Sequence, residues 1–343
     1  MRLKIGLISD KPQGETNCTA ETKHTDIQKK STNEEIYKVL KKKYDVVEII
    51  ADNRIIKNLI ESKIDLAFPL CTGISGESRQ SQVPAILEML RIPYIGSGIL
   101  AHSLSLNKAV AKQIFAYNNI LTPSFQIFNT AGENFNMNLK FPLIVKPSCE
   151  GSGFGIHKDS VVYNKQDLMG KIKSLLKSYC PPVLAEEFIK GREFTIGIIG
   201  NGSEKRFLPI MEINFDDVPE KFGKFYTFEV KSQLSEKTKY ICPASINKDI
   251  ELKIKNSAGR AFDALGCRDF ARVDVRLKED QPYVLEINSL PGLKSQYSDL
   301  PKMALKEGLS YDELIFNIVE ISIRRINKDK RYMEEKVSDK KIS

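Results

Sequence analysis

Residues 145–159 read VKPSCEGSGFGIHKD, with glycines at positions 151, 153 and 155 and a lysine, Lys146, just before them. Glycine-rich backbone can approach a phosphate closely and turn its N–H groups toward it. The spacing is neither G-x-x-x-x-G-K-[ST] nor G-x-G-x-x-G, and a strand-like run follows where those motifs have a helix. We therefore expect a mobile hairpin tip that could fold over a phosphate. Taken alone, the stretch fits an ordinary glycine-rich turn better.

The length and composition are those of a globular protein with two or three domains. The 343 residues are 41% apolar and 28% charged. No apolar run approaches the roughly 20 residues that a membrane helix needs, and the first residues read as a strand rather than a signal peptide. The six cysteines form no C-x-x-C pair, which favours reduced, packed thiols in a cytoplasmic protein.

The net charge of +8 is weak evidence about binding partners. Residues 321–343 alone contain eight Lys/Arg and four Asp/Glu, so half of the net charge comes from this end of the chain. We expect residues 326–343 to be a solvated charged tail. Elsewhere no basic stripe with interleaved aromatic residues suggests nucleic-acid binding, whereas a basic surface suits anionic small molecules such as nucleotides. The three histidines lack metal-ligand spacing, and no G-x-S-x-G elbow is present.

The order of apolar runs predicts an α/β protein with α+β character in its C-terminal half. Residues 1–104 alternate strand and helix, with a capping box at Ser31 and Glu34 opening the first helix, which indicates a parallel sheet. Such sheets bind ligands beyond the carboxyl ends of their strands. We expect a second segment over residues 105–192, opening with a helix from Ser105, and a strand-rich third segment over 193–325.

Polar side chains alternate along two neighbouring strand-like stretches, residues 270–277 and 283–288. Glu286 and Asn288 are two residues apart, so in a strand they face the same side. Asp274 on the other strand could join them, and two carboxylates with one amide form an all-oxygen site suited to Mg²⁺. Arg272 faces the same side as Asp274. A solvated, charge-alternating sheet face is the alternative, although asparagine has poor strand propensity.

Three lysines are placed to meet phosphates: Lys108 in a predicted helix, Lys146 before the glycine loop, and Lys231 in FEVKSQ. Single lysines are more often ordinary surface residues. The stretch VLAEEFIKGREF, residues 183–194, could present a carboxylate and backbone groups to an adenine edge. Glu193, after the turn at Gly191, could accept from ribose hydroxyls.

Together these stretches resemble the ATP-grasp superfamily, and specifically the D-alanine–D-alanine ligase family. The matching segments are RIPYIGSGILAHSLSLNKAVAKQIF (91–115), FPLIVKPSCEGSGFGI (141–156), VLAEEFIKGREFTIGI (183–198), FYTFEVK (225–231) with KYICPA (239–244), and LGCRDFARVDVRL (265–277) with PYVLEINSLPGL (282–293). The resemblance covers about residues 73–319. It implies a Rossmann-like N-terminal domain, with central and C-terminal domains clasping ATP.

The resemblance also implies roles for individual residues. ATP contacts would come from Lys108, Lys146, the loop residues Glu150, Gly151, Ser152, Gly153 and Gly155, then Glu186, Glu187, Ile189, Glu193 and Lys231. Two Mg²⁺ ions, with Mn²⁺ able to substitute, would be held by Asp274, Glu286 and Asn288. Catalysis would use Arg272 and the backbone of Gly292 to stabilise the reacting oxyanion, with Ser152 and Lys231. The implied activity is joining two D-alanines in peptidoglycan (cell-wall) biosynthesis, and the family suggests a homodimer.

The sequence departs from the family pattern in four substrate loops. The first loop lacks H-G-G-x-S-x-E, leaving only Glu15 or Glu21 as substitutes, and Ser232 and Gln233 replace the usual tyrosine after Lys231. The turn after N-x-x-P-G differs, and the loop that keeps Glu77 carries Arg79 in place of a glycine. These changes predict altered amino-acid specificity, and we hypothesise that Arg79, with Tyr297 or Ser298, binds a substrate carboxylate.

Three alternatives to a D-alanine–D-alanine ligase are considered. A related ligase could join other amino acids in a specialised pathway. A non-catalytic ATP-binding regulator would not need Arg272 as an oxyanion donor. A dinucleotide-dependent oxidoreductase is excluded because no G-x-G-x-x-G follows the first strand.

Overall fold

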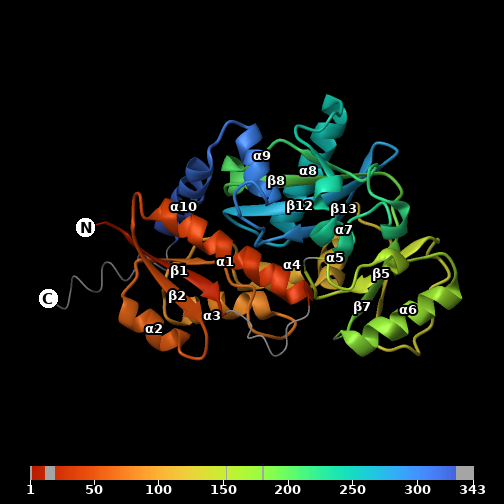
Figure 1. The fold of residues 1–343 in the computed structure, drawn as a ribbon, viewed down its shortest axis with the longest axis horizontal. Coiled ribbons are helices and arrows are strands. Elements are labelled where there is room, and N and C mark those ends of the chain that lie inside the picture. The colour runs from red at the N-terminus through yellow and green to blue at the C-terminus, as the bar shows by residue number, and fades with distance from the viewer. Residues whose placement is uncertain (1, 12–19, 152, 180, 330–343) are drawn as a thin grey trace.

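The computed structural model describes residues 2–11, 20–151, 153–179 and 181–329, without the side chains of residues 20–27 and 235. Three sheets with covering helices make up this part of the chain (Figure 1). Ser152, the Glu15 and Glu21 side chains and most of the charged tail therefore lie outside the description. Within the described residues, no helix has the length and apolar character needed to cross a membrane.

The N-terminal sheet is parallel, with strand order β2-β1-β3. Its elements are β1 (Lys4–Asp10), α1 (Ala20–Leu40), β2 (Asp45–Ala51), α2 (Ile55–Ser62) and β3 (Leu66–Pro69). The predicted βαβαβ order is confirmed. The predicted capping box is wrong, because α1 begins at Ala20 and Ser31 and Glu34 lie inside the helix. Serine and glutamate three residues apart also occur on the solvent-facing side within a helix, so the S-x-x-E pattern alone does not locate a helix start.

The second sheet is antiparallel, with order β4-β7-β5-β6, and α6 packs on it. Its elements are β4 (Phe125–Phe128), β5 (Leu143–Pro147), β6 (Val161–Val162), α6 (Lys165–Ser178) and β7 (Val183–Glu187). Leu143 of β5 pairs with Val162 of β6 in antiparallel register. The glycine-rich loop therefore joins two antiparallel strands, as predicted for a hairpin tip.

The third sheet has order β11-β10-β8-β12-β13, with β9 added to β8. Its elements are β8 (Arg192–Ile199), β9 (Arg206–Phe207), β10 (Met211–Asn214), β11 (Lys239–Ile241), α8 (Lys248–Ala264), β12 (Phe270–Lys278) and β13 (Gln281–Asn288). Helix α8 covers one face of this sheet through contacts with β8, β12 and β13. The central strands β8 and β12 are almost wholly apolar on that face, which explains why they are buried.

The remaining helices connect the sheets. They are α3 (Gln82–Met89), α4 (Ile99–Leu106), α5 (Lys108–Tyr117), α7 (Phe228–Gln233), α9 (Asp299–Lys306) and α10 (Tyr311–Lys328), with short 3₁₀ turns at Arg79–Ser81, Lys158–Ser160, Gly202–Glu204, Glu220–Phe222 and Ser235–Lys237. The helix predicted from Ser105 is interrupted at Asn107. Its backbone is extended and its side chain accepts from the N–H of Val110, so it caps α5 and places Lys108 in the first turn.

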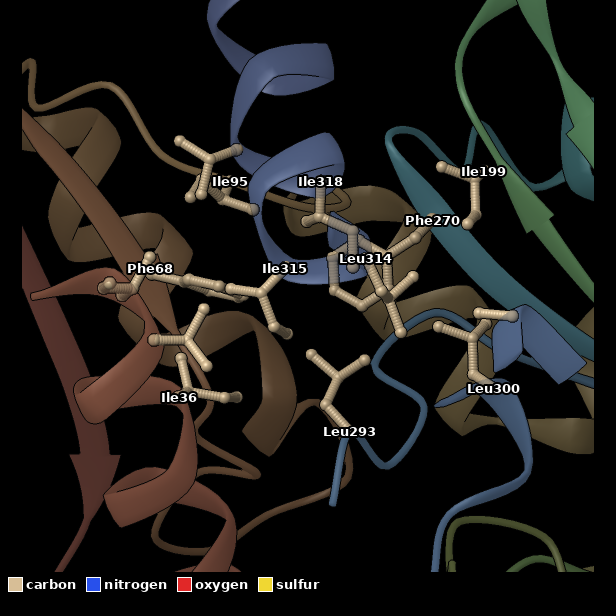
Figure 2. Close-up of a cluster of buried hydrophobic side chains, with 14 of the residues drawn as sticks. Ile36, Phe68, Ile95, Ile199, Phe270, Leu293, Leu300, Leu314, Ile315 and Ile318 are labelled. Carbon is tan, nitrogen blue, oxygen red and sulfur yellow. The ribbon is translucent and has the colours of Figure 1, made fainter. Parts of the chain in front are cut away.

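A buried apolar cluster ties the two ends of the chain together. Helix α10 lies beside α1 and over the N-terminal sheet (Figure 1). In Figure 2 the α10 residues Leu314, Ile315 and Ile318 lie between Ile36, Phe68 and Ile95 on one side and Ile199, Phe270 and Leu300 on the other. The C-terminal helix thus completes the core of the N-terminal sheet and joins it to the third sheet.

Candidate active site

The acidic and amide residues on β12 and β13 meet because these strands are antiparallel neighbours. Asp274 is paired with Glu286 in the register, and Arg272 with Asn288. Asn288 Nδ2 lies 3.0 Å from Asp274 Oδ2 and 3.5 Å from Glu286 Oε1. Arg272 donates from Nε (3.0 Å) and Nη2 (2.9 Å) to Asp274. The four predicted side chains therefore form one cluster.

The donor set of this cluster fits a hard divalent cation. Thr195 Oγ1 also donates to Asp274, at 2.6 Å, so each oxygen of that carboxylate receives two hydrogen bonds. Asn288 turns its N–H groups toward both carboxylates, and rotation of the amide by half a turn would present its oxygen instead. Two carboxylates and an amide oxygen are ligands that Mg²⁺ accepts.

Glu286 lies among cationic side chains. Lys108, in the first turn of α5, places Nζ 3.4 Å from Glu286 Oε2. Burial alone would raise the pKa of Glu286, but Lys108, Lys146, Arg272 and Lys231 hold it well below its usual range. The positive charge of these neighbours therefore keeps the carboxylate ionised.

A second buried acid, Glu186 on β7, lies between two lysines. Lys146 on β5 donates to Glu186 Oε1 at 2.6 Å, and Lys112 on α5 lies 2.8 Å from Oε2. Oε2 has no hydrogen-bond donor in the described part of the chain, so its contact with Lys112 is an ion pair without directed geometry. Glu187, the next residue, accepts from the Lys140 N–H at 3.2 Å, away from this cluster. Sequence reasoning missed Lys112.

Glu193 on β8 is buried and paired. Arg276 on β12 donates to Glu193 Oε2 from Nη2 (2.7 Å) and Nε (3.0 Å), and to the carbonyl oxygen of Ile189 from Nη1 (2.9 Å). Burial raises the pKa of Glu193 despite the attraction of Arg276. Arg276 thus fixes both predicted nucleotide residues, and the sequence analysis did not single it out although it follows Asp274 by two residues on the same strand face.

The glycine-rich loop packs against the segment that carries Lys231. Gly153 and Gly155 have φ of 81° and 74°, and a Cβ at Gly155 would lie 2.6 Å from the Pro147 side chain. The Phe228 N–H donates to the Ile156 carbonyl at 2.9 Å, and the rings of Phe154 and Phe228 lie 5.8 Å apart. The loop needs these glycines to turn back onto the start of α7.

Lys231 lies on α7 within the same region. Its Nζ lies 5.5 Å from the centre of the Tyr226 ring. Burial and the nearby Arg272 lower the pKa of Lys231, while Asp299, Glu286 and Asp274 oppose that shift. The predicted lysine therefore lies near the acidic cluster, together with Lys108 and Lys146.

The predicted substrate residues do not all converge. Arg79 donates to the Cys149 carbonyl oxygen (3.0 Å) and to Glu150 Oε2 (3.0 Å) in the glycine-rich loop. Glu77, two residues earlier, is exposed. Ser298 Oγ instead accepts from the Lys294 N–H at 3.1 Å in the turn before α9.

That turn lies close to the backbone of Gly292. A Cβ at Gly292 would lie 2.6 Å from Ser298 Oγ, so a side chain there would displace the Ser298 hydroxyl. Tyr297, the residue before Ser298, lies near Lys294, whose Nζ is 5.7 Å from its ring centre. Gly292, Tyr297 and Ser298 therefore belong to one compact turn after β13.

Two further residues near the cluster were missed by sequence reasoning. Asp299 is buried at the start of α9, with Oδ2 3.4 Å from Arg272 Nη1. Buried His102 on α4 lies 2.8 Å from Ser289 Oγ, next to Asn288, and burial lowers its pKa to about 4. An aspartate at a helix start and a lone histidine in an apolar helix carry no distinctive sequence signal.

Known proteins match the chain over most of its length. A model of the D-ala D-ala ligase C-terminus matches residues 113–320. A D-alanine–D-alanine ligase from Carboxydothermus hydrogenoformans is 36% identical over 83% of this chain and 90% of its own length. An uncharacterised protein, y4sG, from Sinorhizobium fredii is 36% identical over 76% of this chain and 75% of its own.

Solved structures agree with these matches. The D-alanine–D-alanine ligase from Bacillus anthracis, solved in complex with ATP, is 28% identical, with a TM-score of 0.73, and covers 97% of this chain and 99% of its own. The arrangement of three sheets is thus that of an ATP-grasp ligase. With a family match over more than half of its length, the chain belongs to the D-alanine–D-alanine ligase family of ATP-dependent, peptide-bond-forming ligases.

Proposed function

We propose that the protein uses ATP to convert the carboxylate of one amino acid into an acyl phosphate, and then joins that acyl group to the amine of a second amino acid. D-Alanyl-D-alanine is the product we expect first, since relatives of this name match most of the chain. The single observation that carries the proposal is the gathering of Lys108 and Arg272 around the carboxylates of Glu286 and Asp274.

The nucleotide would lie between the second and third sheets. Lys108 and Lys146 would contact its phosphates, with Lys231 at the γ-phosphate, and the loop Glu150–Gly155 would close over them. The family resemblance assigns Glu186 to the adenine site; its two oxygens lie 2.6 Å from Lys146 Nζ and 2.8 Å from Lys112 Nζ. The backbone of Ile189 would complete the adenine site, and Glu193, oriented by Arg276, would accept from the ribose.

Mg²⁺ would be held by Asp274, Glu286 and Asn288, whose donor types suit it. Two ions are proposed at these residues, and Mn²⁺ could substitute. When bound, the metal supplies charge neutralisation for two anionic reactants. The chain's own part is to keep Glu286 ionised among lysines and to orient Asp274 through Thr195 and Arg272.

The reaction would run in two steps. First, a carboxylate oxygen of the first amino acid attacks the γ-phosphorus of ATP, the bond to the bridging oxygen breaks, and ADP leaves. Then the amine of the second amino acid attacks the acyl carbon, the carbon–oxygen bond to phosphate breaks, and the amine loses a proton. Arg272 and the Gly292 N–H would stabilise the oxyanion of the second step, and the closed loop would exclude water.

A ligase of different amino-acid specificity is the second candidate. The observation that favours it is Asp299, buried 3.4 Å from Arg272, where a negative charge would act on the bound amino acid. Two further changes point the same way: Arg79 lies in the 3₁₀ turn Arg79–Ser81, and Ser232 and Gln233 follow Lys231 at the end of α7. A non-catalytic regulator would bind ATP without consuming it.

The experiment that tests the proposal is a panel assay. The protein is incubated with Mg-ATP and single or paired D- and L-amino acids, and ADP release and dipeptide formation are measured. ADP release with D-alanine, together with the dipeptide, supports the first candidate. Turnover only with another pair replaces it with the second, and ATP binding without turnover under any condition replaces both with the regulator.

A further inference from the structure

Lys112 is a buried cation that the proposed mechanism does not use. It lies on α5 with a side chain that is 0% exposed, so it cannot contact a ligand. Its Nζ lies 2.8 Å from Glu186 Oε2 and donates to Thr122 Oγ1 at 2.8 Å. Thr122 in turn donates to the carbonyl oxygen of Val284 on β13, the strand that carries Glu286. The ammonium is therefore held by two partners, and one of them, Thr122, is itself fixed to β13.

The location of Lys112 makes a charge there costly. Moving an ammonium group into a protein interior is unfavourable unless partners compensate. One carboxylate, Glu186, lies between Lys112 and Lys146, whose side chains are 0% and 7% exposed. Two ammonium groups therefore share one carboxylate. A single lysine would have been enough to neutralise Glu186, so the second lysine adds one positive charge that Glu186 does not neutralise.

Lys146 is the lysine of this group that would contact the phosphates in the proposed nucleotide site. Burial would lower the pKa of Lys146, but Glu186 and Glu286 raise it above its usual value, so its ammonium is retained. Without Lys112, Lys146 and Glu186 would form a neutral pair. With Lys112 the group carries a net charge of +1, which acts on a polyanion across a poorly screened interior.

We propose that Lys112 is a positioning residue for the nucleotide, which offsets the charge of Glu186 so that Lys146 faces the ATP phosphates with its positive charge uncancelled. This inference rests on the proposed ATP site. Lys112 would thus strengthen phosphate binding through its charge, without touching the nucleotide.

The first measurement is the ATP dissociation constant, by calorimetry, of the wild-type protein and of K112M, in which an unbranched apolar side chain replaces the lysine. The removal of one charge from a low-dielectric interior predicts an affinity lower by on the order of tenfold. Lys171→Met is the matched control. That lysine also lies on a helix and forms one ion pair, with Asp159 at 2.6 Å, and its loss should leave ATP affinity unchanged.

The double variant K112M/E186Q separates charge from structure. It removes one positive and one negative group, so the net charge returns to that of the wild type, and a neutral pair replaces a buried ion pair, which proteins commonly tolerate. We expect its ATP affinity to exceed that of K112M, although an adenine contact has been lost. This variant also keeps the test available if K112M alone fails to fold.

The pH dependence supplies a readout that a purely structural role would not change. The charged groups that face Lys112 are Glu186 from β7, Lys146 from β5 and Glu286 from β13, and burial lowers the pKa of Lys112 to about 8. Lys112 loses its proton as the pH rises from 7 to 9. ATP affinity should therefore fall over this range in the wild type, and less in K112M/E186Q.

The outcomes distinguish this inference from the proposed function. A wild-type protein that does not bind ATP overturns both. A wild-type protein that binds ATP overturns the role of Lys112 alone if K112M has the same affinity, if K112M/E186Q binds more weakly than K112M, or if wild type and double variant have the same pH dependence. The predicted order of affinities, with the wild-type decline above pH 8, supports it.

Discussion

The guanidinium of Arg79 lies 3.0 Å from the carboxylate of Glu150, and the same side chain donates to the Cys149 carbonyl oxygen. Arg79 belongs to the loop after β3, and Glu150 opens the glycine-rich loop. The two loops that would enclose the reactants, one beside the amino acid and one above the phosphates, are therefore joined by an ion pair whose side chains are 20% and 27% exposed.

This contact gives the first prediction. R79A should lower kcat/KM, because it loosens the loop and removes a cation from the proposed amino-acid site. If Arg79 acts through Glu150, the losses in R79A and E150Q will not add, and the KM for ATP will rise. If it binds the substrate carboxylate, the KM for the amino acid will rise instead. Arg54→Ala, at an exposed arginine, is the control, and full kcat/KM in R79A contradicts either role.

The second prediction concerns Glu286. E286Q removes the negative charge that lies among Lys108, Lys146, Arg272 and Lys231. It also replaces a carboxylate that we propose as a ligand of the metal. We expect kcat to fall by at least about a hundredfold, and the Mg²⁺ concentration for half-maximal ADP release to rise. Glu251→Gln, which breaks an exposed pair with Lys255, should change neither quantity. An E286Q protein with wild-type Mg²⁺ dependence would exclude Glu286 as a ligand.

The third prediction concerns Asp269, which joins distant parts of the chain. It accepts from the Gly96 N–H, Asn201, Ser322 and Arg325, and its side chain is 0% exposed. D269N should reduce the free energy of unfolding by about 3 kcal/mol, because it leaves Arg325 without its charge partner. Asp312→Asn, in an exposed pair with Lys42, should cost under about 1 kcal/mol. Chemical denaturation of the three proteins compares them.

The Asp269 contribution should depend on pH in one direction. Burial would raise the pKa of Asp269, but Arg325 and the other donors hold it below its usual value. The stabilisation is therefore complete above the unfolded-state pKa of about 3.9, and is lost as the pH falls through the lower folded-state value. The stability difference between wild type and D269N should stay constant from pH 8 to 5 and shrink below about pH 4. A difference that grows in acid would contradict this assignment.

The fourth prediction tests how α10 completes the N-terminal core. Leu314 is fully buried between the N-terminal sheet and the third sheet (Figure 2). L314A should lower the free energy of unfolding by about 2–5 kcal/mol through lost burial and the cavity left behind. Leu305, on α9 and 60% exposed, supplies the control L305A, which should cost well under about 1 kcal/mol. Equal losses in the two variants would mean that α10 does not support the core.

Much of the fold follows from local pattern. The βαβαβ start, the hairpin around the glycine loop and helix α8 are set by apolar periodicity and turn residues, which act over a few positions. The packing of α10 (Tyr311–Lys328) on a sheet whose strands lie between Lys4 and Pro69 is a long-range contact that periodicity does not encode. Helix α1 begins at Ala20, well before Ser31, so the S-x-x-E pattern does not mark its start; its buried residues Ile36, Val39 and Leu40 all lie after Ser31.

The cluster of Asp274, Glu286 and Asn288 was predictable because strand alternation and a short hairpin bring the residues to one face. Lys112, Arg276 and Asp299 were not, because each is defined by a partner distant in sequence: Glu186, Glu193 and Arg272. The partner of Arg79 was also missed. Its charge indicated a carboxylate, but the sequence does not reveal that Glu150 supplies one.

The central claim is that the γ-phosphoryl group passes to a carboxylate of the substrate, and isotope transfer tests this most directly. The amino acid that supports turnover is labelled with ¹⁸O in its carboxyl group and incubated with Mg-ATP and the protein, and the released phosphate is analysed by mass spectrometry. Formation of an acyl phosphate predicts one ¹⁸O atom in the inorganic phosphate for each peptide bond formed. Phosphate that carries no ¹⁸O while dipeptide accumulates would contradict the account.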